Sequence, residues 1–167
     1  MNADAHLNLD AMKLQALKEA MGCFATGIAV VTTRFEDGDY GMTCNSFNTV
    51  SLDPPLVLWS VQRTASSHRA FVEGGGYAVS ILAAEQEEVA LRFTRGTPAE
   101  RFAGLPVERL PSGRLVVGGA VAWFDCALEN AVEAGDHDVL IGRVLAFAST
   151  GKDPLGYLRG EFRALRS

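Results

Sequence analysis

Short runs of β-branched and apolar residues, separated by turn signals, constrain the fold of this sequence more than any other feature. The run Ile28–Thr33 is typical, and Glu36–Asp39 behind it contains the Asp-Gly pair favoured in tight hairpin turns. The run at 56–61 is apolar at nearly every position, which predicts a strand buried on both faces. Further strands are expected at 40–43, 49–52, 77–82, 115–117, 120–130, 139–150 and 157–165.

A few segments have the pattern of short helices. Asp10 is a suitable N-cap for a first helix that Gly27 is expected to end. One face of this helix carries apolar residues at helical spacing, namely Leu14, Leu17, Met21 and Phe24. Two more helices are expected at 65–73 and 85–93, and the Gly/Pro-punctuated stretch at 96–113 reads as a loop.

The balance of these elements predicts a mostly β fold. Strands outnumber helices and do not alternate with them regularly, so a Rossmann sheet is disfavoured. We expect a closed or nearly closed antiparallel β-barrel with short helices inserted between its strands. With 167 residues, of which 48% are apolar, residues 1–167 suit a single domain, with a flexible N-terminus over residues 1–10.

Charge and hydropathy narrow the class of partner. The net charge of −5 and the lack of a basic run disfavour binding to nucleic acid or to an anionic membrane surface. No apolar run approaches the roughly 20 residues that a membrane span needs. The polar start, Met1–Leu9, does not read as a secretory signal, so we expect a cytoplasmic protein. A small molecule is the expected ligand.

The cysteines do not suggest a disulfide framework or a metal site. Their number is odd, and Cys23, Cys44 and Cys126 form no C-x-x-C pair, so we expect three reduced, mostly buried thiols. Asp136, His137 and Asp138 are neighbours, but no second histidine stands at ligand spacing, and we expect no metal.

The segment Gly41–Pro55, with the sequence G-M-T-C-N-S-F-N-T-V-S-L-D-P-P, is the most informative in the chain. It places hydroxyl and amide side chains between two apolar strands. Such groups beside free backbone N–H groups suit a ligand rich in carbonyl oxygens, ring nitrogens and phosphate oxygens. The alternative is a polar loop whose hydroxyls only bind its own backbone, and composition does not decide between the two.

His137 stands in a predicted turn before a strand. Its imidazole offers a flat ring and a hydrogen-bond donor, and Asp136 or Asp138 could fix its tautomer. Taken alone, however, a histidine in such a turn is more often a solvated loop residue. The same ordinary reading applies to His6 and His68.

Several segments together resemble the flavin reductase-like family, the small reductase partners of two-component flavin-dependent monooxygenases. The resemblance begins with F-x-x-G-I-A-V-V-T-T (Phe24–Thr33) and the Gly41–Pro55 segment. It continues through S-x-x-R-A-F (Ser66–Phe71), G-Y-A-V-S-I-L (Gly76–Leu82), E-R-F (Glu100–Phe102) and G-D-H-D-V-L-I-G-R-V (Gly135–Val144). The matches span roughly Phe24 to Tyr157, which is nearly the whole domain.

The resemblance implies an FMN-binding split β-barrel that transfers hydride from NADH or NADPH to FMN or FAD at a homodimer interface. It further implies a monooxygenase partner that receives the reduced flavin. Thr43, Asn45 and Ser46 would line the flavin, with Cys44 filling space and backbone groups around Val50 and Ser51 meeting the ring edge. The segment that holds the phosphate would offer Ser66, Ser67, Arg63 or Arg69, and these four stay unranked. His137, in the G-D-H match, would position the nicotinamide.

Two alternatives remain open at this point. One is an FMN-dependent oxidase on the same barrel, which would need a basic cluster for a substrate phosphate that the sequence does not show. The other is a flavin-binding electron carrier that does not consume NAD(P)H. A fold match alone does not distinguish these from a reductase.

Overall fold

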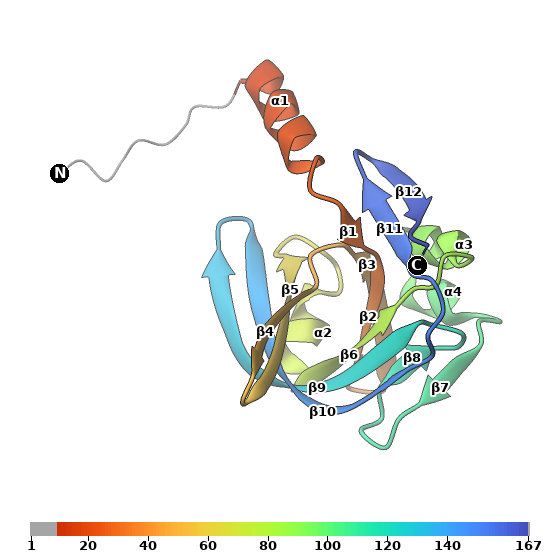
Figure 1. Cartoon of the computed structure of the whole chain (residues 1–167). Helices are drawn as coiled ribbons and strands as arrows, with labels where there is room; N and C mark the ends of the chain where they lie inside the picture. Colours follow the sequence, from red (N-terminus) through yellow and green to blue (C-terminus); the bar gives the residue numbers. More distant parts are fainter. Residues whose placement is uncertain (1–9, 167) are drawn as a thin grey trace.

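Residues 10–166 of this computed structural model are described here, and they are mostly strand (Figure 1). The sequence predicts a flexible N-terminus over residues 1–10, and of these residues all but Asp10 lie outside the described part of the chain. The helices are α1 (Ala11–Met21), α2 (His68–Glu73), α3 (Glu87–Arg92) and α4 (Pro98–Phe102). The strands are β1 (Thr26–Gly27), β2 (Ala29–Phe35), β3 (Gly38–Cys44), β4 (Asn48–Leu52), β5 (Pro55–Gln62), β6 (Gly76–Ile81), β7 (Val107–Arg109), β8 (Leu115–Val117), β9 (Ala122–Ala134), β10 (His137–Ser149), β11 (Leu155–Leu158) and β12 (Glu161–Ala164).

The main sheet has seven antiparallel strands in the order β3-β2-β6-β9-β10-β5-β4. It curls around a core but does not close, because its two edge strands are not paired with each other (Figure 1). These edges, β3 and β4, follow each other in the chain. The mostly β barrel expected from the sequence is therefore confirmed as a split barrel.

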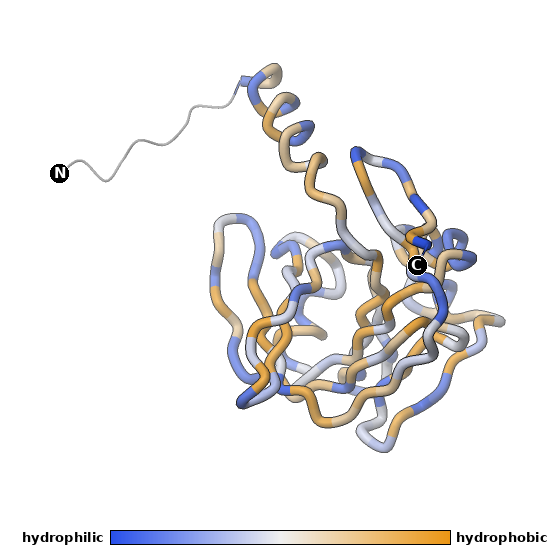
Figure 2. The backbone as a smooth tube through the Cα atoms, viewed as in Figure 1, coloured by the Kyte–Doolittle hydropathy of each residue, from blue (hydrophilic) through white to orange (hydrophobic). Residues whose placement is uncertain are grey.

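The core fills the inside of the curled sheet. Trp59 on β5 packs edge-on against Phe71 of α2, with ring centroids 4.7 Å apart, and against Tyr77 of β6 at 5.9 Å. All three side chains are fully buried. Figure 2 shows hydrophobic segments along the central strands and a hydrophilic tip on the β9–β10 hairpin. Helix α2 thus closes one side of the barrel by burying its aromatic residue.

The region beside the open edge carries a smaller sheet. Strand β11 pairs with both β1 and β12, and the turn between β11 and β12 consists of Arg159 and Gly160, both with positive φ. Two central residues of this conformation are typical of a type I′ hairpin turn. The hairpin therefore refutes the single strand expected at 157–165.

Other expectations also need correction. The first helix ends at Met21, where the N–H of Gly22 bonds to Lys18, rather than at Gly27. The segment 96–113 is not a plain loop, because a Thr97–Glu100 capping box starts α4 and β7 pairs with β8. Strand β5 is not buried on both faces: within residues 56–61 the odd-numbered residues are buried and the even-numbered ones are half-buried, and both end residues are exposed.

The chain has no membrane-spanning helix over residues 10–166.

Tyr77 tests the packing of the barrel. Its hydroxyl donates to the carbonyl of Leu140 at 3.0 Å and approaches that of Val57 at 3.4 Å, so it bridges β5 and β10 from inside. We expect Tyr77→Phe to lower the free energy of unfolding by about 1 kcal/mol, because a buried hydrogen bond is lost. Urea unfolding measures this, with Tyr40→Phe as the control. Equal stability of the two variants would contradict the bridge.

Candidate functional site

The short link at 45–47 joins the two open edges of the main sheet and lies at the centre of the candidate site. The exposed side chain of Asn45 borders three neighbouring hollows of about 400, 350 and 330 Å³. Each is within the size range of small-ligand sites. The predicted polar segment therefore lies beside open space rather than being sealed against the core.

Two of the predicted hydroxyls are used inside the chain. The hydroxyl of Thr43 donates to the carbonyl of Ala90 at 2.6 Å, which ties β3 to α3. The hydroxyl of Ser46 accepts from the N–H of Ser60 at 3.0 Å, which ties the link to β5. These side chains hold the walls of the hollows in place. The exposed amide of Asn45 borders all three hollows, and that of Asn48, whose oxygen accepts from the N–H of Thr49, borders the 400 Å³ hollow alone.

Val50 and Ser51 lie on the edge strand β4. The register of β4 against β5 shifts between Thr49 and Ser51, so Val50 is a bulge residue and stays exposed. A bulge at a sheet edge leaves backbone groups without ladder partners. This agrees with the expectation that backbone groups here meet a ligand, which stays a prediction.

Sequence reasoning missed several residues that border the hollows. They come from the segment after α1, from the end of α3 and from the β11–β12 hairpin: Phe24, Thr26, Leu91, Thr94, Tyr157, Gly160 and Phe162. Tyr157 and Phe162 contact each other with ring centroids 5.5 Å apart. The alternation Tyr-x-x-Gly-x-Phe around a turn is the signal that identifies this wall.

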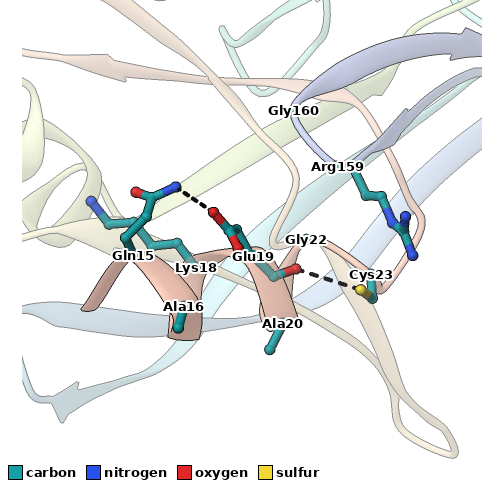
Figure 3. Close-up of a pocket in the computed structure, with 9 residues that line it drawn as sticks. All are labelled: Gln15, Ala16, Lys18, Glu19, Ala20, Gly22, Cys23, Arg159 and Gly160. Carbon is teal, nitrogen blue, oxygen red and sulfur yellow. Dashed lines mark hydrogen bonds between the residues drawn. The ribbon is translucent and has the colours of Figure 1, made fainter. Parts of the chain in front are cut away.

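A larger cavity of about 660 Å³ lies next to this region, between α1 and the β11–β12 turn (Figure 3). Its walls include Glu19, Cys23 and Arg159, and it shares Lys18, Gly22 and Gly160 with the 330 Å³ hollow. None of the site residues predicted from the sequence lines it.

The four candidates for holding a phosphate now differ. Ser67 is buried, with its hydroxyl 3.9 Å from the Met42 sulfur. Nε of Arg69 donates to both carboxylate oxygens of Glu73, at 3.1 and 3.2 Å. Ser66, Arg63 and Arg69 are exposed, and Arg63 is paired with Glu133 at 3.0 Å just as Arg69 is paired with Glu73. The structure therefore sets aside only Ser67, and of the three that remain, Ser66 and Arg63 belong to the turn at 63–67 between β5 and α2.

His137 is the first residue of β10 rather than a turn residue. Its Nδ1 lies 2.7 Å from a carboxylate oxygen of Asp136. This hydrogen bond and the charge of the imidazole hold the pKa of Asp136 below its usual range. Of the two carboxylates considered for fixing the His137 tautomer, Asp136 does so, while Asp138 points to His68 instead.

Strand β5 connects the two parts of the site. Ser46 bonds to Ser60 on one side of β5, and His137 stands opposite Gln62 on the other. Two strand spacings, about 10 Å, therefore separate the link from β10. The hollows around Asn45 do not include His137, Ser66 or Ser67, so one chain presents two separate parts.

The thiols give a chemical test of this region. Burial raises the pKa of Cys44 to about 11 and that of Cys126 to about 12. Cys126 is buried, but Cys44 is half-buried at the border of the 350 Å³ hollow and Cys23 is exposed, contrary to the expectation of mostly buried thiols. Below these pKa values the two thiols stay protonated and unreactive. At pH 8 we expect Ellman's reagent to label Cys23 rapidly and the other two only after denaturation. Fast labelling of Cys44 in the native protein would refute its space-filling role.

Comparisons with known proteins agree with this geometry. The family model described as "Flavin reductase like domain" matches residues 21–166. The FMN reductase (NADH) SmoA of Agrobacterium fabrum is 43% identical over 148 residues, covering 89% of this chain and 84% of that protein. The reductase component of the flavin-dependent trigonelline monooxygenase of Acinetobacter baylyi is also 43% identical. That match covers 90% of this chain but only 48% of the length of the Acinetobacter protein.

A solved structure extends the likeness to the fold. The NADH:FAD oxidoreductase SgcE6 of Streptomyces globisporus, in complex with NAD and FAD fragments, superposes with a TM-score of 0.88 at 33% identity. The match covers 95% of this chain and 96% of that one. The split barrel, the polar link at its open edge and the match over residues 21–166 show that this chain belongs to the flavin reductase-like family.

Proposed function

We propose that this protein reduces a flavin, FMN or FAD, with NADH or NADPH and supplies the reduced flavin to a partner monooxygenase. The observation that carries the proposal is Asn45, an exposed amide at the meeting point of three hollows on the open edge of a flavin reductase fold. The relatives named as reductase components of monooxygenases support the same activity.

The residues at the open edge fit a flavin. Its fused rings need an elongated, mostly apolar space with a few hydrogen-bonding groups at the rim. The hollow lined by Thr43, Asn45 and Tyr157 is mostly apolar, with the Asn45 amide at its border. Exposed backbone groups at the Val50 bulge add donors and acceptors. The phosphate would be held by Ser66 and by Arg63 or Arg69, whose present partners are Glu133 and Glu73.

The protein's contribution is position rather than proton transfer. A bound flavin supplies the hydride acceptor, and the protein holds the reactants and compensates charge. Thr43 and Ser46 fix the walls through their internal hydrogen bonds. His137, oriented by Asp136, would contact the nicotinamide.

A homodimer is part of the proposal, because a second copy would complete the divided site. Helix α1 has no buried residue, and Met12, Met21 and Phe24 are 85%, 65% and 76% exposed. Leu52 on β4 and Phe147 on β10 are 95% and 71% exposed. Side chains as exposed as these are candidates for the contact between two copies. The cytoplasmic location expected from the sequence stays a prediction.

An absorbance assay tests the activity. The loss of NADH or NADPH absorbance is followed with and without added FMN, FAD or riboflavin. We expect rapid oxidation only when flavin is present. A yellow protein that binds flavin but leaves NADH and NADPH intact would instead support an electron carrier, and consumption of oxygen with a tightly bound FMN and an amine substrate would support an oxidase.

Asn45 is the first substitution to make. Asn45→Leu keeps the side-chain size but removes the amide that borders all three hollows, so flavin should bind at least about tenfold more weakly. A fluorescence titration with FMN and FAD measures the affinity. Asn130→Leu, an exposed amide on β9, is the matched control and should bind flavin normally. Normal affinity in both variants would remove Asn45 from the site.

His137 is tested through steady-state kinetics. His137→Ala removes the proposed contact with the nicotinamide, so KM for NADH or NADPH should rise about tenfold while flavin affinity stays nearly constant. Asp136→Asn keeps the imidazole but weakens its orientation and should have a smaller effect. A KM for NAD(P)H equal to that of the native protein in His137→Ala counts against the assignment.

A further inference from the structure

Asp138 is a buried carboxylate with an incomplete set of partners. Its side chain is only 9% exposed, and one oxygen, Oδ2, lies 2.6 Å from Nε2 of His68. The other oxygen, Oδ1, is buried without a hydrogen bond, and the nearest charged nitrogen is Nε of Arg63 at 3.9 Å. Because a buried carboxylate is costly unless it is paired, His68 is the contact on which its burial depends.

The pair joins two segments that the proposed function uses separately. His68 is the first residue of α2 and directly follows the turn at 63–67, which carries Ser66 and Arg63. Asp138 directly follows His137 on β10. The bond between them therefore connects the turn proposed to hold the phosphate with the strand proposed to hold the nicotinamide.

Backbone contacts close the same junction from its other side. The N–H of Arg63 donates to the carbonyl of Asp136 at 3.0 Å, and the N–H of Ala65 donates to that of Gln62 at 3.0 Å. The turn is thus fixed near its start by the backbone and at its end by His68. Without the side-chain pair, the end that carries Ser66 would lose its tie to β10.

No other charged group at this junction is placed to replace His68 as the hydrogen-bond partner of Asp138. Glu133 of β9 stands opposite Asp138 in the register, and its carboxylate engages Arg63 at 3.0 Å. Arg63 is therefore shared between two carboxylates and is within hydrogen-bond distance of Glu133 alone. The carboxylate of Asp136 is engaged by His137. Among residues 10–166, His68 is the one side chain that hydrogen-bonds to Asp138.

We propose that His68 and Asp138 are positioning residues that hold the turn at 63–67 in register with His137, so that one hydrogen-bonded pair sets the placement of both substrates. The inference rests on the proposed function, because it assigns flavin phosphate to this turn and nicotinamide to His137. Neither residue needs to contact a substrate. The sequence favoured an ordinary solvated role for His68, and its contact with Asp138 is visible only in the fold.

The test compares single and paired substitutions in steady-state kinetics. In His68→Ala and in Asp138→Ala, we expect KM for flavin and KM for NADH to rise together, each about tenfold, with kcat changed less than about threefold. His68→Gln keeps a donor near the position of Nε2 and should restore both KM values to within about twofold of the native protein. The double variant should be no worse than either single one, because the two act as a unit.

A buried ion pair elsewhere in the fold provides the matched control. Arg114, in the segment before β8, and Asp125, on β9, lie 2.9 Å apart with side chains 12% and 7% exposed. Asp125→Ala should lower the melting temperature and leave both KM values unchanged. If Asp138→Ala does not fold, His68→Ala carries the test, since this ring is partly exposed at 22%.

The outcomes separate this inference from the proposed function. Unchanged KM values in folded His68→Ala would overturn the positioning role, even if the melting temperature falls. A rise in KM that His68→Gln does not reverse would also overturn it. If the native protein itself fails to oxidise NADH with flavin, the proposed function is wrong; flavin titration of His68→Ala then decides about the pair alone, and equal affinity refutes it.

Discussion

The opening between β3 and β4 is the constraint on which the rest of this structure depends. A sheet that curls without closing leaves two edges whose backbone groups must find partners in water, in a ligand or in another chain. In this protein the two edges are consecutive in the chain, so a link at 45–47 crosses the opening. The amide of Asn45 and the bulge at Val50 are therefore placed at the opening by topology.

Strand β5 connects the link at 45–47 with the part of the site on β10. Val57, Trp59 and Val61 point from β5 into the core, and their burial holds the strand in place in the wall of the barrel. Its backbone then serves both sides, binding the Ser46 hydroxyl through Ser60 and pairing with His137 through Gln62. A displacement of β5 would move both parts of the site, so the packing of Trp59 is linked directly to function.

Much of the fold could be predicted from the sequence, because strands and turns leave local signals. The β-branched run from Ile28, the N-cap at Asp10 and the short strand at 115–117 were all predicted close to their observed bounds. Two of the errors share a cause. Whether β5 is buried on one face or two, and whether 96–113 pairs with another segment, depends on distant partners that one sequence does not display.

The site shows the same division between local and distant information. The polar segment around Asn45 was recognisable because hydroxyl and amide residues are unusual between two apolar strands. The wall formed by Tyr157 and Phe162 was missed, because its residues are more than 100 positions away and join the site only through the pairing of β11 with β1. The bond between His68 and Asp138 spans 70 positions and leaves no trace in the spacing of either residue.

The use of polar groups in this site argues for a ligand that leaves. The hydroxyls of Thr43 and Ser46 form hydrogen bonds with backbone groups of the same chain, and Ser67 is buried. Few side chains of one chain therefore remain free to contact a ligand directly. Affinity that rests on a small number of contacts in open hollows is modest, because each polar contact contributes little beyond the water it replaces. A protein that delivers reduced flavin to a second enzyme needs this property: a rigid frame that orients the rings during hydride transfer, and a hold weak enough to release them afterwards.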